Sequence, residues 1–289
     1  MSDIRYIASV TFFSVVAVPA ATLAVLRLCH CTEKNFRGET IPVSFGISLL
    51  ISTELLLSVV IRNTPVSTKM LLLFVSTAAV FGLLGLLDDR LGDKAIKGLK
   101  GHFAAALRGK ITTGFLKAIG GLAWSVYCAW RVSPHLIGVV ILNGLLIALC
   151  ANLFNLLDLR PGRSSAVFLL SAGMLLGIAG NSLSILPATA GLATVVVSAI
   201  PCWLLDSRAK VMLGDTGSNL LGGSLGLAIA MLHNTALSVG VLAILIFVHV
   251  IAERKSLTAV IAASPILCAM DKLTGIRGDV QSSMPKKQQ

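Results

Sequence analysis

Apolar residues are grouped along the chain in nine long stretches, which polar segments separate. A helix that crosses the hydrocarbon core of a bilayer needs about 20 mostly apolar residues. The pattern therefore predicts an all-α polytopic membrane protein with about nine (nine to ten) transmembrane helices. The nine stretches are Tyr6–Leu28, Val43–Ile61, Met70–Leu87, Gly114–Trp130, His135–Leu157, Ser165–Gly180, Leu183–Leu205, Gly217–Leu232 and Thr235–Ala252.

The same pattern divides the chain into two parts. Residues 1–252 are expected to form a single transmembrane helical domain, which carries the active site on its cytoplasmic face. Residues 253–289 are expected to form a polar, amphipathic cytoplasmic tail, with a surface helix at Ser256–Leu273.

Composition excludes a soluble or a disordered protein. Of the 289 residues, 55% are hydrophobic and only 13% are charged, whereas ordinary soluble domains carry about 25% charged residues. The net charge of +11 is explained by cationic loops that face anionic lipid, so no nucleic-acid partner is expected. The six cysteines lack the spacing of a metal-binding cluster.

Charge also predicts the orientation. Nine spans place the two termini on opposite sides, and with the N-terminus outside and the C-terminus in the cytoplasm, 20 of the 24 lysines and arginines face inward. This obeys the positive-inside rule. A cleaved signal peptide at the start would invert the rest of the chain and export the cation-rich segment Asp88–Lys117, so the first stretch is expected to remain as a helix.

Two adjacent carboxylates end the third apolar stretch. Asp88 and Asp89 lie where the negative end of the helix dipole disfavours anions, and they repel each other. A nearby cation should offset both effects. Either Arg90 and Lys94 form an ordinary charge cluster with them, or the pair serves a divalent metal with a phosphate ligand.

A second polar group ends the fifth stretch. Asn152, Asn155 and Asp158 follow one another at intervals of three residues, which places neighbours on adjacent parts of one helical surface. The amides either hydrogen-bond to neighbouring helices or bind substrate. Arg160 and Arg163 come next, around a proline and a glycine, and their guanidinium groups suit phosphate.

A third motif, Gly214-Asp215-Thr216-Gly217-Ser218, opens the eighth stretch. It is either a simple helix start, with Asp215 or Thr216 as the N-cap, or a phosphate-binding site made by free N–H groups at a helix N-terminus. In the second interpretation Gly214 and Ser218 contact substrate and Asp215 holds a metal ion.

The predicted topology places all three motifs on the cytoplasmic side. Acids for a metal ion, amides, arginines and a helix start beside a bilayer describe phosphoryl transfer between a soluble nucleotide donor and a lipid acceptor. A transporter would need ionisable groups deep in several helices, and Glu54 is the only acid well inside a predicted span.

With these motifs in order and in register, the sequence resembles the superfamily of polyprenyl-phosphate N-acetylhexosamine-1-phosphate transferases, glycosyltransferase family 4. It includes phospho-N-acetylmuramoyl-pentapeptide transferase and the undecaprenyl-phosphate GlcNAc-1-phosphate transferases. The resemblance runs from about the second to the ninth stretch. The segments that carry it are residues 85–92, 152–158 and 214–222.

The resemblance implies a Mg²⁺-dependent enzyme (Mn²⁺ being the alternative ion) of the bacterial inner membrane. It would move a sugar phosphate from a UDP-sugar to undecaprenyl phosphate, release UMP and serve the synthesis of a cell-envelope polymer. A homodimer is left open. The residues that it implicates are Asp215 and Asp158 for the metal, Asp88, Asp89 and Asp215 for catalysis, and Lys100, Asn155 and Asp158 for substrate. The local motifs, and not the resemblance, add Asn152, Arg160, Arg163, Gly214 and Ser218 as substrate-binding candidates.

The chain also departs from the family pattern. The second motif lacks its second aspartate, because Pro161 takes that place, and the histidine-rich motif of the last large cytoplasmic loop is absent after His249. The alternative function is therefore a non-catalytic member that binds polyprenyl phosphate or a nucleotide sugar as a scaffold.

Overall fold

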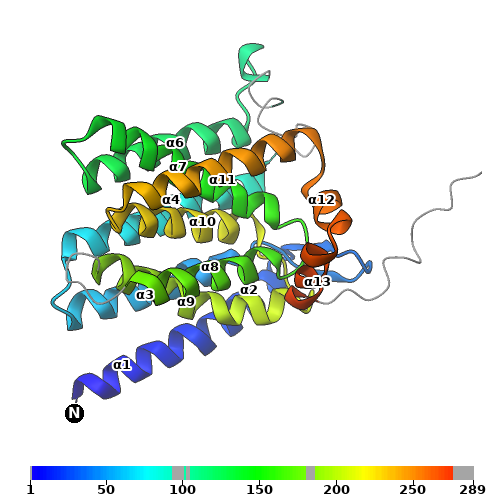
Figure 1. Cartoon of the computed structure of the whole chain (residues 1–289). Helices are drawn as coiled ribbons and strands as arrows, with labels where there is room; N and C mark the ends of the chain where they lie inside the picture. Colours follow the sequence, from blue (N-terminus) through cyan, green and yellow to red (C-terminus); the bar gives the residue numbers. More distant parts are fainter. Residues whose placement is uncertain (1, 93–100, 102–104, 180–185, 276–289) are drawn as a thin grey trace, which may run out of the picture.

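The protein is an up-and-down bundle of long helices. The computed structural model describes residues 2–92, 101, 105–179 and 186–275, and Figure 1 shows its long helices lying side by side. The first half contains α1 (Ser2–Phe12), η1 (Phe13–Ala17), α2 (Val18–Leu28), β1 (Thr32–Lys34), β2 (Thr40–Pro42), α3 (Gly46–Asn63), α4 (Thr68–Leu91) and α6 (Thr113–Val132). The second half contains α7 (Ile137–Leu157), α8 (Arg163–Ala179), α9 (Leu186–Asp206), α10 (Gly214–Met231), α11 (Thr235–Arg254), α12 (Leu257–Ala263) and α13 (Pro265–Thr274).

Each of the nine apolar stretches coincides with a helix in the described residues, although Val43–Phe45, His135, Leu136 and Leu232 lie just outside the helix ends. The first corresponds to α1, η1 and α2, which form one helical run with a π-helical turn at Phe13–Ala17. By length and composition, six helical segments of the described chain are suited to cross a membrane, or seven if the bent pair α12–α13 counts as one. The chain is therefore an all-α polytopic membrane protein. Nine spans and the orientation of the termini stay predictions.

The central helix α10 explains part of the difference between the nine predicted spans and the six helical segments that are suited to cross a membrane. It is buried along its length from Thr216 to Met231 and packs most extensively on α4 and α7. A helix that other helices surround does not face lipid, so its sequence can be rich in glycine and serine. At Gly222 an added Cβ would lie 2.4 Å from the carbonyl oxygen of Cys150, so a small residue lets α10 and α7 touch.

The outer helices show the opposite pattern. On α11, Ile244 and Phe247 are 63% and 65% exposed, and little of this apolar helix is buried. Large apolar side chains on the outside of a bundle are expected where the solvent is lipid rather than water.

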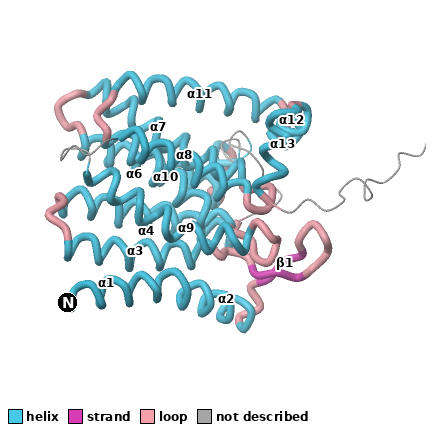
Figure 2. The backbone as a smooth tube through the Cα atoms, turned by 60° about the horizontal axis from the view of Figure 1, so that its bottom comes forward, coloured by secondary structure: helices cyan, strands magenta, loops and turns pink. Residues whose placement is uncertain are grey.

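A short hairpin and the last two helices gather at the end of the bundle away from the N-terminus (Figures 1 and 2). The strands β1 and β2 pair antiparallel. The hairpin continues into hydrogen bonds with the loop before α10, because Met212 N donates to Pro42 O and Phe45 N donates to Met212 O. These backbone contacts fix the start of α10, where the third motif lies.

Candidate functional site

The ends of α4 and α10 meet where the first and third motifs lie. Gly85 faces the start of α10 so closely that an added Cβ would stand 2.2 Å from the carbonyl oxygen of Asp215. Only glycine permits this approach. It brings the last turn of α4, with Asp88 and Asp89, beside Asp215.

Asp89 caps α10 from another helix. Its Oδ1 accepts a hydrogen bond from Asp215 N at 2.9 Å, and its Oδ2 accepts from Thr216 N at 3.2 Å and from Thr216 Oγ1 at 2.7 Å. A carboxylate is favoured here because the first N–H groups of a helix lack intrahelical partners and carry the positive end of its dipole. The residue that caps α10 is therefore neither Asp215 nor Thr216.

Lys117 links the acidic groups of the site. It lies in the first turns of α6, and its Nζ forms an ion pair with Asp88 Oδ2 at 2.6 Å and a second one with Asp215 Oδ2. Thr113, one turn earlier, donates from Oγ1 to Asp88 Oδ1 at 2.6 Å. One ammonium group thus joins carboxylates from the first and third motifs.

The second motif contributes Asn155 to the same cluster. With its amide oriented to satisfy both partners, its nitrogen donates to Asp215 Oδ1 at 2.6 Å and its oxygen accepts from Lys117 Nζ at 3.2 Å. Asn155, near the end of α7, therefore contacts both Asp215 and Lys117. All three motifs thus converge on one place.

Asp158 and Asp206 form the inner side of the cluster. Asp158 follows α7 directly, and burial, together with the nearby carboxylates of Asp206, Asp215 and Asp89, raises the pKa of Asp158 well above its ordinary value, although a hydrogen bond from the Gly214 backbone opposes this. Asp206 accepts a hydrogen bond from Gly162 N at 2.8 Å. Burial of this kind disfavours the charged carboxylate.

The cluster has the donor chemistry of a magnesium site. Five aspartates, at positions 88, 89, 158, 206 and 215, surround the start of α10, and Lys117 supplies one positive charge. Among the described residues, no three His, Cys, Asp or Glu side chains already surround a common metal position. Mg²⁺ needs only one or two protein carboxylates when substrate phosphates and water complete its shell, so the residues present fit that ion.

The other residues predicted to bind substrate differ in burial and in the partners that they contact. Asn152 is half-buried one turn before Asn155, and Arg160 is partly exposed in the loop after α7. Ser218 is fully buried in α10, and the N–H of Gly214 serves Asp158. The guanidinium of Arg163 binds Asp271. Lys100 lies outside the described residues.

Lys117 and Asp206 were not singled out by the sequence. Lys117 offered one usable signal, since a lysine within an apolar helix is expensive in a membrane and usually has a function. Asp206 offered none, because its role depends on backbone N–H groups that only the folded chain brings near.

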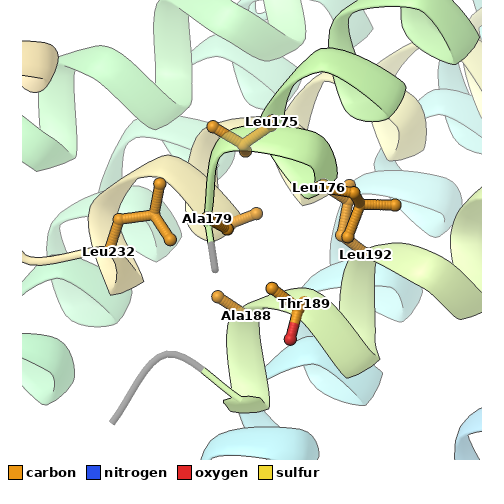
Figure 3. A pocket seen from close by; sticks show the side chains of 8 residues that line it. Leu175, Leu176, Ala179, Ala188, Thr189, Leu192 and Leu232 are labelled. Carbon is orange, nitrogen blue, oxygen red and sulfur yellow. The ribbon is translucent and has the colours of Figure 1, made fainter. Parts of the chain in front are cut away.

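An apolar pocket lies between α8, α9 and α10 (Figure 3). Figure 3 shows Leu175, Leu176 and Leu192 around it, with Thr189 at its edge. It lies toward the end of α8 and the start of α9, away from the aspartate cluster, and the described residues that line it carry none of the charged groups that phosphate chemistry requires.

Comparison with known families agrees with this geometry. The model of glycosyl transferase family 4 matches residues 71–233, more than half of the chain, and this span includes the aspartates of all three motifs, Lys117 and Asn155. No curated protein matches the chain. At the level of the family, the match supports a membrane-embedded transferase that moves a sugar phosphate to polyprenyl phosphate. The resemblance of the three motifs is thereby confirmed, and the chain belongs to glycosyl transferase family 4.

Proposed function

We propose that the protein transfers a sugar-1-phosphate from a UDP-sugar to polyprenyl (undecaprenyl) phosphate, which yields polyprenyl-pyrophosphate-sugar and UMP. It would do so in the bacterial inner membrane, with the site facing the cytoplasm, in the synthesis of a cell-envelope polymer. The observation that carries the proposal is the Lys117 ammonium between Asp88 and Asp215, at the start of α10, in a chain of this family.

The reaction requires positioning and control of charge more than covalent chemistry by the protein. An oxygen of the acceptor phosphate attacks the β-phosphorus of the UDP-sugar, and the bond from that phosphorus to the bridging oxygen breaks, so that UMP leaves. Asp215 and Asp158 would hold Mg²⁺ (or Mn²⁺), which would supply charge neutralisation at the phosphate oxygens. Asp88, which Lys117 and Thr113 hold in place, is assigned to the acceptor phosphate.

The remaining side chains prepare the site. Lys117 holds the carboxylates of Asp88 and Asp215 together although they repel each other. Asn155 fixes the orientation of Asp215, and Asp89 holds the first turn of α10 in place. Arg160, partly exposed beside the cluster, is assigned to the donor diphosphate.

The test is release of UMP by the purified protein in lipid nanodiscs with undecaprenyl phosphate, a panel of UDP-sugars and Mg²⁺. Asp215→Asn should abolish this release while the variant keeps its folded thermal transition. Persistent UMP release by Asp215→Asn would refute the catalytic assignment. The scaffold alternative predicts binding of polyprenyl phosphate or a nucleotide sugar by the wild type with no UMP from any donor.

Removal of the metal gives a second test. Chelation by EDTA should stop UMP release, and added Mg²⁺ should restore it, because the aspartates of the cluster outnumber the cation that faces them. Full activity after exhaustive chelation would contradict the assignment of Asp215 and Asp158 to a metal.

A further inference from the structure

The last two helices contact the loop that follows the second motif. α12 and α13 follow α11 and lie at the same end of the bundle as the aspartate cluster (Figures 1 and 2). They lie beyond residue 233, where the match to the family ends. What they do in this chain must therefore be derived from their contacts.

A buried ion pair joins α13 to the start of α8. Arg163 Nε donates to Asp271 Oδ1 at 2.7 Å and Arg163 Nη2 donates to Asp271 Oδ2 at 3.0 Å. The two residues are only 2% and 7% exposed. A third bond, from Arg163 Nη1 to Thr258 Oγ1 at 3.3 Å, includes α12 in the same contact.

The end of α13 also touches the loop that follows Asp158. Gly162, at a φ of +73°, would place a Cβ 2.5 Å from Thr274 O and 2.7 Å from Ser207 Cβ. Trp203 Nε1 donates to Thr274 O at 3.3 Å. The loop is thus held between the end of α9 on one side and the end of α13 on the other.

The chemistry of the pair indicates what it is for. A buried ion pair gains little net stability over apolar packing, because both charges lose their hydration. A bidentate arginine–carboxylate pair does fix direction and register, since its two parallel hydrogen bonds form in one geometry. Such a pair specifies where α13 sits on the loop.

We propose that Arg163 and Asp271 are positioning residues that clamp α12 and α13 against the loop of residues 158–162. The clamp holds Asp158 and Arg160 in place for the donor diphosphate. This assigns Arg163 to the protein scaffold, in place of the substrate contact that its sequence suggested. The part that concerns the donor rests on the proposed function, and the clamp itself does not.

The clamp is tested by hydrogen–deuterium exchange on the full-length protein. Arg163→Ala and Asp271→Ala should each speed amide exchange in residues 159–163 and 266–274 at least tenfold. The exchanged pair, Arg163→Asp with Asp271→Arg, should return both segments to within threefold of the wild type. Arg208→Ala is the control, because this exposed arginine just after α9 donates only locally, to Leu204 O four residues earlier, among the contacts of the described residues. Unchanged exchange at residues 159–163 in both single variants would overturn the clamp.

The effect of the clamp on donor binding is measured as the Kd of the protein for UDP. This measurement requires no turnover. Each single variant should bind UDP at least fivefold more weakly, and the exchanged pair should recover most of that loss. If the single variants do not fold, Trp203→Phe removes the hydrogen bond to Thr274 O but keeps an aromatic ring, and it should weaken UDP binding about twofold. Faster exchange with an unchanged Kd would overturn the positioning role. Absence of sugar-phosphate transfer by the wild type would refute the proposed function, while the exchange data and the Kd would still decide the clamp.

Discussion

At the scale of single residues, the site depends most on Lys117. A lysine in an apolar helix is costly in a membrane unless it is paired, and here its ammonium faces Asp88, Asp215 and the amide oxygen of Asn155. Two carboxylates that would otherwise repel each other are kept close by the ammonium group between them.

Lys117→Met should therefore remove activity while keeping a side chain of similar length. We expect UMP release to fall by about 10²–10³-fold, which is typical when a preorganised charged group is lost from an active site. Lys69→Met is the matched control, because Lys69 is exposed at the start of α4, at the far end of that helix. Equal activity in the two variants would contradict the role of Lys117.

We expect Asp89 to contribute to the free energy of unfolding as well as to the rate of UMP release. Asp89→Ala removes the acceptor for Asp215 N and Thr216 N, and loss of a helix cap costs about 1 kcal/mol of the free energy of unfolding. Asp89→Asn keeps one carbonyl acceptor, so it should retain more stability and activity than the alanine variant. Equal inactivation by both changes, with no loss of stability, would show that the charge of Asp89 takes part in catalysis directly.

The residue types of the site could be predicted, and their partners could not. The aspartates and Asn155 belong to local motifs that the sequence displays. The cap that Asp89 provides and the pair between Arg163 and Asp271 join positions more than 100 residues apart, and no local pattern records which distant group the folded chain brings near.

At the scale of elements, the contact between α4 and α10 determines the site. Gly85→Ala would place a Cβ 2.2 Å from Asp215 O and force the two helices apart. Overpacking of this kind costs about 1–3 kcal/mol, and we expect a lower thermal transition together with a loss of UMP release.

The control for that change is Gly173→Ala in α8, where an added Cβ meets nothing within 4 Å. It should leave activity unchanged, because the added methyl group meets no neighbour and alanine favours a helix over glycine by up to about 1 kcal/mol. If Gly85→Ala behaves like this control, the close approach of α4 to α10 is not required.

Apolar length predicted where the helices lie, because burial in lipid or in the bundle needs a long apolar run whatever its partners are. It did not predict the hairpin of β1 and β2, which is short and polar and which Asn35 stabilises by accepting from Arg37 N and Glu39 N. Nor did it distinguish the enclosed α10 from the lipid-facing α11, since both are apolar by sequence.

At the scale of the whole molecule, one end of the bundle carries the chemistry. The aspartate cluster, the hairpin and the clamp of α13 all lie at that end, and the first residues lie at the other (Figure 1). The excess of inward cations predicts that the end with the cluster faces the cytoplasm.

The native cysteines can test this orientation. Cys29 is exposed beside the hairpin, so a membrane-impermeant maleimide should label it only after the cells are permeabilised. A variant with His135→Cys, at an exposed position before α7, should be labelled in intact cells. The reverse pattern would overturn the predicted orientation.

The proposed reaction transfers to the lipid a group that includes a phosphate. Its most direct measurement uses a UDP-sugar with a radioactive β-phosphate, polyprenyl phosphate and the purified protein. We expect the label to enter the lipid product while unlabelled UMP is released in equal amount. Label that leaves as UDP, with an unlabelled glycolipid, would contradict it.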